Sequence, residues 1–342
     1  MREGALARAI RDRALLLGYD QCGLIRLKDL NGYAEALTGR ISEYPASRAM
    51  LERLHNLADV TRARPWARSV LICARSFGHY RVPEHLLGRI ASVYLLINLS
   101  LAGGPDDLRA QALEAYLAEL GLRAEGDRRG GLTAMRWAAQ AAGLGVIRRN
   151  NFFYTDRGSR VWLEAWLLDQ DLELKEESGL PPCPEKCDKC QRACPTAALK
   201  GPYSMCPTDC VTFQTAFSPV LPMDNPQHRA LGQWIFGCDE CQNACPHNRA
   251  LGEGREECPG LDELAGQISL AQLMEMNQET MRELLPPRFW YIGPERVWRW
   301  KVNVLNAMNN DFQEEYRPLV ERAAADPVPE VRATAAWVSA QI

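Results

Sequence analysis

The sequence has no long apolar run and no marked excess of one charge sign. Its longest apolar stretch, VYLLINLSLAG at residues 93–103, is about half as long as a membrane span. A net charge of −3 over 342 residues gives no reason to expect binding to nucleic acid or to an anionic membrane. Residues 1–20 lack the apolar core of a secretory signal and instead predict an amphipathic helix. We therefore expect a cytoplasmic protein with no membrane partner.

Cysteine is the residue type that the sequence has in excess. There are twelve cysteines, and nine of them fall between Cys183 and Cys245. Disulfides are typical of small exported domains, whereas this chain is long and shows no export signal. A local cluster of thiols in such a chain indicates a metal site.

The clustered cysteines form two runs of the same spacing. CDKCQRACP begins at Cys187 and CDECQNACP begins at Cys238, and both read C-x2-C-x3-C-P. This spacing is typical of ferredoxins with two [4Fe–4S] clusters, in which the last cysteine of a run binds the neighbouring cluster. The alternative is a pair of zinc ribbons, which usually combine C-x2-C pairs or add histidines.

Counting then predicts two sets of ligands. One cluster takes Cys187, Cys190 and Cys245, with Cys183 as the natural fourth ligand. The other takes Cys194, Cys238 and Cys241, and spacing alone leaves Cys206 and Cys210 open as its fourth ligand.

The flanking segments predict an α/β fold class with added modules. Residues 1–178 are expected to form an α/β domain, 179–255 a ferredoxin-like domain with two [4Fe–4S] clusters, and 256–342 a helical segment. Residues 67–77 predict a buried strand and 106–122 an amphipathic helix that ends near Gly121, while 159–174 predict another strand or a buried helix. At the C-terminal end, two short helical patterns divided by DPVPE predict one HEAT-like helix pair.

Several segments together resemble the epoxyqueuosine reductases, cobalamin-dependent iron–sulfur enzymes of tRNA modification. The segments that carry the resemblance are GYDQCGL at 18–24, ARSVLICARSF at 67–77, AAGLGVIRRNNFFYTDRGSRVWLEAWLLD at 141–169, CVTFQTAF at 210–217, IFGCDECQNACPHN at 235–248 and RVWRWKVNVLNAMNND at 296–311. They cover nearly the whole chain.

The resemblance implies a cofactor, a ligand and a set of site residues. It implies that Cys210, and not Cys206, completes the second cluster. It also implies a base-off cobalamin between the N-terminal and cluster domains, and a corrinoid site that includes Gly143, Gly145, Arg149, Asn150, Ser159 and Trp162.

The sequence departs from the family at the expected proton donor. The family's aspartate falls on Arg129, and arginine does not give up its proton near neutral pH. Asp127 lies two residues away, and Tyr154 or Tyr94 would offer a phenolic proton instead. Our candidate catalytic residues are therefore Asp127, Arg129 and Tyr154.

Three functions follow as hypotheses. The first is a corrinoid-dependent reductase of an unidentified substrate that takes electrons from a ferredoxin or flavodoxin. The second is a protein that relays electrons to another corrinoid protein and has no substrate chemistry of its own. The third is a true epoxyqueuosine reductase. Because of the change at Arg129, we expect tRNA not to be a partner.

Overall fold

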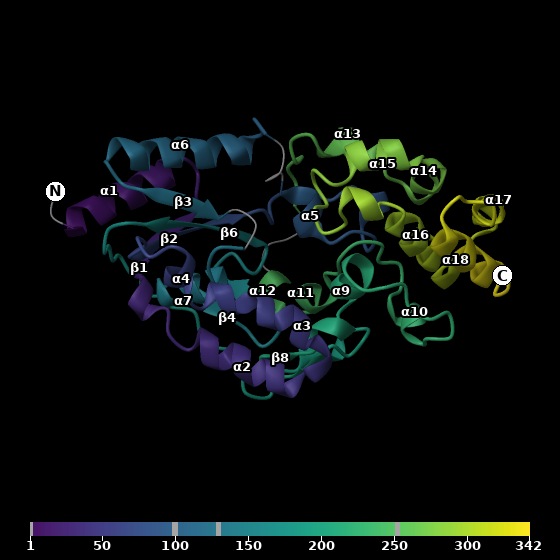
Figure 1. Cartoon of the computed structure of the whole chain (residues 1–342), viewed down its shortest axis with the longest axis horizontal. Helices are drawn as coiled ribbons and strands as arrows, with labels where there is room; N and C mark the ends of the chain where they lie inside the picture. Colours follow the sequence, from purple (N-terminus) through teal and green to yellow (C-terminus); the bar gives the residue numbers. More distant parts are fainter. Residues whose placement is uncertain (1–2, 98–101, 128–130, 250–253) are drawn as a thin grey trace.

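An antiparallel four-stranded sheet lies in the N-terminal half of the chain in the computed structural model (Figure 1). The structure describes residues 3–97, 102–127, 131–249 and 254–342. The strand order is β1-β2-β6-β3. The strands are β1 (Gln21–Arg26), β2 (Ser69–Ser76), β3 (Ala124–Asp127) and β6 (Val161–Leu168). Arg129 lies outside the described residues.

Helices cover both faces of this sheet. On β2 every residue is buried, with Leu71 and Cys73 facing one core and Val70, Ile72 and Ala74 the other, as the two-residue period of a strand requires. The first core is completed by α1 (Glu3–Leu16) and α6 (Pro105–Glu119), and the second by α4 (Val60–Ala63) and α7 (Met135–Ala141). The predicted strands and the helix ending near Gly121 are thus confirmed, and 159–174 contributes a strand.

Short elements connect the sheet to the cysteine-rich segment. These elements are α2 (Tyr33–Glu43), α3 (Arg48–Leu51), α5 (Ser92–Leu96), β4 (Val146–Ile147), β5 (Phe153–Tyr154), β7 (Leu199–Gly201) and β8 (Ser204–Met205). The cysteine-rich segment itself holds α8 (Lys189–Arg192), α9 (Val211–Ala216), α10 (Gln227–Ala230), α11 (Glu240–Asn243) and α12 (Pro246–Arg249).

The C-terminal part is helical. It consists of α13 (Leu261–Ala265), α14 (Leu270–Glu275), α15 (Gln278–Leu284), α16 (Arg299–Asn310), α17 (Arg317–Ala323) and α18 (Pro329–Ser339). The two helices predicted at the C-terminal end are present as α17 and α18, and both share a core with α16. That core also includes Leu95 and Leu96 of α5, so a piece of the N-terminal half packs with the C-terminal helices.

Helix α16 fixes the cysteine-rich segment in place through a buried polar face. The Arg299 guanidinium donates to the carbonyl of Ser218 at 3.1 Å, and Asn303 Nδ2 donates to the carbonyls of Thr215 and Ile235, each at 2.8 Å. Arg299 and Asn303 are one helical turn apart and therefore lie on the same face. These bonds satisfy backbone carbonyls that would otherwise be buried without a donor.

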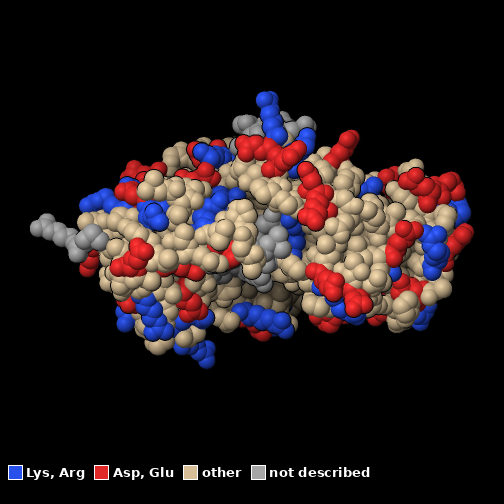
Figure 2. Space-filling model, turned by 90° about the horizontal axis from the view of Figure 1, so that it is seen from above, with Lys and Arg blue, Asp and Glu red and all other residues tan. Residues whose placement is uncertain are grey.

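Charges of both signs are mixed on the face of the molecule seen in Figure 2. This agrees with the small net charge of −3. Among the described residues, no helix combines the length and the apolar character needed to cross a bilayer.

Candidate iron–sulfur and cofactor site

The two cysteine runs adopt the same local structure. In each run the C-x2-C pair ends in a four-residue helix, α8 in the first and α11 in the second. An aspartate precedes each helix, Asp188 and Asp239 respectively. The repeat in sequence is therefore a repeat in structure.

The first predicted set of ligands surrounds one cavity. Cys183, Cys187, Cys190 and Cys245 all line a cavity of about 370 Å³. Burial raises the pKa of the Cys190 thiol, and the charges of the other three cysteines raise it further. A cluster would remove this penalty, because iron binds the deprotonated thiolate.

The second predicted set also comes together. Burial raises the pKa of the Cys241 thiol well above its usual range, and the neighbouring Cys238, Cys210 and Cys194 raise it further. Cys206 is not among these neighbours. Its sulfur lies 3.3 Å from Oγ1 of Thr208 instead. The structure thus groups Cys210, and not Cys206, with the other three.

The arrangement of the thiols differs from that of a single-ion site. Within the described residues, no three His, Cys, Asp or Glu side chains converge as ligands of one metal ion. A [4Fe–4S] cluster binds each thiolate at a different iron atom, so its ligands stand farther apart than those of a zinc ion. The two observations are compatible.

Two neighbouring arginines contact the first cysteine set, and one of them, Arg149, is among the residues predicted at the corrinoid. Arg148 is 2% exposed, and its Nη1 lies 3.9 Å from the sulfur of Cys183. Arg149 donates to the backbone carbonyls of Cys187, at 2.8 Å, and Glu185. Arg148 therefore places a buried positive charge beside the thiols, and Arg149 holds the loop that carries Cys187.

Tyr154 faces the same set. It is fully buried, and its hydroxyl accepts a hydrogen bond of 2.8 Å from Nδ2 of Asn150. Burial and contact with Cys245 raise the pKa of its hydroxyl. Asp127 is the last residue of β3 and pairs with Ala165. The role of Asp127 as a proton donor stays a prediction.

A separate cavity of about 420 Å³ is lined by residues of the sheet, of the second cysteine run and of the segment between α15 and α16. We call it the aromatic cavity, after the rings in its wall: Tyr33, Phe77, Tyr94, Trp137, Phe152, Phe153, Trp162, Trp290 and Tyr291. Ser159 and Trp162, two of the predicted corrinoid residues, line it. The indole nitrogen of Trp162 is buried and has no hydrogen-bond partner in the described part of the chain.

Hydrogen bonds and packing tie the aromatic cavity to the second cysteine run. Ser159 Oγ donates to Oε1 of Gln242 at 2.8 Å, and Gln242 follows Cys241 directly. A Cβ at Gly237, which precedes Cys238, would come within 2.8 Å of the ring of Tyr94. The wall of the cavity therefore rests on the loop that carries Cys238 and Cys241.

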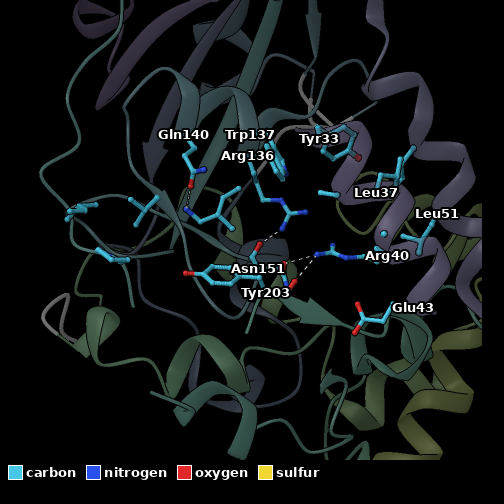
Figure 3. Close-up of a pocket in the computed structure, with 17 residues that line it drawn as sticks. Tyr33, Leu37, Arg40, Glu43, Leu51, Arg136, Trp137, Gln140, Asn151 and Tyr203 are labelled. Atoms are coloured by element: carbon cyan, nitrogen blue, oxygen red, sulfur yellow. Dashed lines mark hydrogen bonds between the residues drawn. The ribbon is translucent and has the colours of Figure 1, made fainter. Parts of the chain in front are cut away.

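A larger cavity of about 750 Å³ adjoins the aromatic cavity, and both are lined by Tyr33, Leu54, Arg136 and Trp137. We call it the arginine cavity, because Arg40 and Arg136 point into it (Figure 3). Arg136 was not among the predicted site residues, although it lies only seven positions after Arg129 in the sequence. Trp290 and Tyr291 were not predicted either, because they are distant in sequence from the other residues of the aromatic cavity.

Gly143 and Gly145 line neither the aromatic nor the arginine cavity. A Cβ at Gly143, where φ is +76°, would lie 1.6 Å from the carbonyl oxygen of Glu176, and one at Gly145 would lie 2.1 Å from that of Tyr154. Close approach of backbone segments thus accounts for both glycines. Their part in binding a corrinoid stays a prediction, as does that of Arg149 and Asn150.

Comparisons with known proteins agree with the cysteine arrangement. Residues 183–248 match the family model for a 4Fe-4S double cluster binding domain. The chain is 32% identical over 258 residues to the epoxyqueuosine reductase of Gloeobacter violaceus, a match covering 71% of this chain and 76% of the relative. It is 26% identical to that of Staphylococcus aureus, covering 69% of this chain and 60% of the relative.

Solved structures show the same fold. The epoxyqueuosine reductase of Streptococcus thermophilus superposes with a TM-score of 0.77 at 20% identity, covering 98% of this chain and 90% of that one. An epoxyqueuosine reductase with an epoxyqueuosine-modified tRNA stem loop gives a TM-score of 0.73 at 20% identity, with the same coverage. The relative from Gloeobacter violaceus is similar enough, over enough of its length, to decide the relationship. The chain therefore belongs to the epoxyqueuosine reductase family of iron–sulfur oxidoreductases.

Proposed function

We propose that this protein is a reductase that binds a corrinoid in the aromatic cavity and supplies it with electrons from two [4Fe–4S] clusters. The observation that carries the proposal is the contact between the wall of this cavity and the second cysteine run. Tyr94 packs against Gly237, and Ser159 is bonded to Gln242. A group bound in the cavity would thus lie next to a redox centre.

The residues of the cavity suit a large planar cofactor. Its wall is aromatic, and it shares Tyr33, Leu54, Arg136 and Trp137 with the arginine cavity of about 750 Å³ beside it. The indole N–H of Trp162 is free to donate to an amide oxygen, of which a corrin ring carries several. When bound, a corrinoid supplies a strongly reducing and nucleophilic metal centre.

The two cysteine sets suggest the direction of electron flow. Around the first set, Lys186, Lys189 and Arg192 lie at the surface and line its cavity. A basic rim suits an acidic electron donor, since complementary charges speed association. The second set lies against the aromatic cavity. We infer that electrons enter at Cys183, Cys187, Cys190 and Cys245 and leave from Cys194, Cys210, Cys238 and Cys241.

Three tyrosines in the aromatic cavity are kept protonated. Burial raises the pKa of the hydroxyls of Tyr33, Tyr94 and Tyr291. Near neutral pH they can therefore donate hydrogen bonds to a substrate oxygen and orient it. Asp127 remains our candidate for the group that transfers the proton.

Epoxyqueuosine in tRNA is the first substrate to test. The relatives bear that name, and one neighbouring structure contains a modified tRNA stem loop, which goes against our expectation that tRNA is not a partner. The reaction takes up two electrons and two protons and converts the epoxide to an alkene and water. A relay protein would not need an aromatic cavity beside a cysteine run, so the cavity favours a reductase.

The test is an anaerobic assay of the cluster-loaded protein with an epoxyqueuosine-containing stem loop, cobalamin and a low-potential reductant. Mass spectrometry of the nucleosides would report loss of one oxygen atom. Cobalamin-dependent loss of oxygen would support the proposal with tRNA as substrate. Loss of oxygen that proceeds equally well without cobalamin would contradict it. No reaction, despite bound cobalamin, would exclude this substrate.

A further inference from the structure

Two arginines converge in the arginine cavity from separate elements (Figure 3). Arg40 comes from α2 and Arg136 from α7. Arg40 Nη2 donates to Oδ1 of Asn151 at 3.1 Å and to the carbonyl of Tyr203 at 3.0 Å, and Arg136 Nη1 donates to the carbonyl of Asn151. All of these acceptors are neutral. They direct the two guanidinium groups without compensating their charge.

The charge of the cavity is positive. Among the described residues, its lining includes three charged ones, Arg40, Arg136 and Glu43, which gives a net charge of +1. The Glu43 carboxylate already accepts hydrogen bonds from Tyr44, at 2.7 Å, and Ser204, at 2.6 Å. In the described part of the chain, no carboxylate lies within ion-pair distance of Arg40 or Arg136, while the nearby Arg48 on α3 pairs with Glu52.

Asn151 adds an unused donor at the same place. Its side chain is 7% exposed, and within the described residues its Nδ2 has no hydrogen-bond partner. Its backbone φ is 64°, a conformation that asparagine tolerates better than most residues. A buried donor without an acceptor is costly unless a ligand supplies one. Two guanidinium groups and this amide together match the several acceptor oxygens of an oxyanion.

The rest of the lining is apolar and aromatic. The rings of Tyr33 and Trp137 meet edge to face, with centroids 5.9 Å apart, and Leu37 and Leu51 lie beside them. Tyr33 and Trp137 also line the aromatic cavity. A ligand held at the arginines could therefore extend its body toward the proposed reaction site.

We propose that the arginine cavity binds an oxyanion, a phosphate or carboxylate group carried by an organic molecule, through Arg40, Arg136 and Nδ2 of Asn151. The inference rests on the proposed function, because it assumes that the bound molecule extends into the aromatic cavity, where the reaction is proposed to occur. Two sources share this chemistry. One is the substrate, and the other is the phosphodiester of a corrinoid's nucleotide tail.

The test is calorimetric titration of inorganic phosphate into the anaerobically purified, cluster-loaded protein at low ionic strength. We expect saturable binding that weakens about 10- to 100-fold in Arg40→Gln, because a charge-assisted hydrogen bond is lost. Arg48→Gln is the matched control and should bind as the native protein does. Arg136→Gln should also weaken phosphate binding. Arg40→Lys should bind phosphate more tightly than Arg40→Gln, because it restores the positive charge. Thermal melts would establish that each variant is folded.

Cobalamin and cobinamide, which lacks the nucleotide tail, separate the two sources. If Arg40→Gln weakens the binding of cobalamin but not of cobinamide, the site holds the corrinoid's phosphodiester. If it weakens phosphate binding alone, the site holds a substrate anion. Absence of phosphate binding, or equal binding by the native protein, Arg40→Gln and Arg136→Gln, would overturn the inference. The phosphate titration needs no corrinoid and no turnover, so its failure would leave the proposed function intact.

Discussion

At the scale of single residues, the cysteines are the part of the site that the sequence predicts best. Ligands of one run are three or four residues apart, so local backbone geometry decides where they lie. The choice between Cys206 and Cys210 was different, since it came from a resemblance and not from spacing. The structure adds an independent reason, because Cys206 contacts Thr208 while Cys210 faces Cys194 and Cys238.

The first prediction compares these two thiols. Cys210→Ala should lower the iron content from about eight atoms per chain to about four, because one cluster loses a ligand. Cys206→Ala should leave the iron content near eight. Iron and sulfide analysis after anaerobic purification measures both. The opposite pattern would show that Cys206 is the ligand.

The spacing of residues in the sequence does not predict which side chains line the two cavities. Tyr33, Arg136, Trp290 and Tyr291 meet there only after the chain has folded. Each resembles an ordinary core or surface residue when it is considered alone. Periodicity predicts whether a side chain is buried, but it does not predict which distant side chains will border the same space.

At the scale of elements, the interior strand β6 holds a buried carboxylate, that of Glu164. Glu164 is 1% exposed, and its Oε2 accepts a hydrogen bond of 2.6 Å from the hydroxyl of Tyr19. Burial raises the pKa of Glu164 to about 7. The folded protein therefore takes up a proton at Glu164 at pH values where the unfolded chain has already released it.

The second prediction is a loss of stability as the pH rises. The contribution of Glu164 is fully present below its unfolded pKa of about 4.3 and is lost as the pH rises through about 7. Glu164→Gln keeps the acceptor for Tyr19 but does not ionise. The variant should be more stable than the native protein at pH 8 by about 1–3 kcal/mol, with a smaller difference at pH 5. Denaturant unfolding at both pH values measures this, and a difference independent of pH would contradict it.

The contact between α5 and the second cysteine run gives a third prediction. Gly237, where φ is +75°, leaves no room for a Cβ beside Tyr94 and Ala91. Gly237→Ala should displace Tyr94 and lower both iron retention and the melting temperature. Gly260, where φ is +69°, has open space around it, so Gly260→Ala carries the backbone strain alone, about 1 kcal/mol. Equal effects of the two substitutions would mean that packing against Tyr94 is unimportant.

Local patterns predicted the main elements because they depend on neighbouring residues. The buried run at 67–77 is β2, and the periodic segment at 106–122 is α6. The packing of α5 with the C-terminal helices could not be anticipated in this way, because it joins Leu95 to Trp300 across some 200 residues of chain. The polar face of α16 could not be predicted from local patterns either. Asn303 is bonded to the carbonyl of Ile235, which is distant in sequence.

At the scale of the whole molecule, residues from three distant parts of the chain line the aromatic cavity. The sheet contributes Trp162, the second cysteine run contributes Gln242, and the C-terminal part contributes Trp290 and Tyr291. The first cysteine set and its basic rim line a separate cavity, to which Lys186 and Lys189 contribute. This separation is what an enzyme needs if it receives electrons at one place and uses them at another.

The central claim is that a corrinoid binds in the aromatic cavity, and the ratio of cobalt to iron tests it most directly. The protein would be purified without oxygen, incubated with excess cobalamin, separated from free cofactor and analysed for both metals. We predict about one cobalt and about eight iron atoms per chain. Eight iron atoms without cobalt would contradict the claim and would leave an iron–sulfur protein that relays electrons.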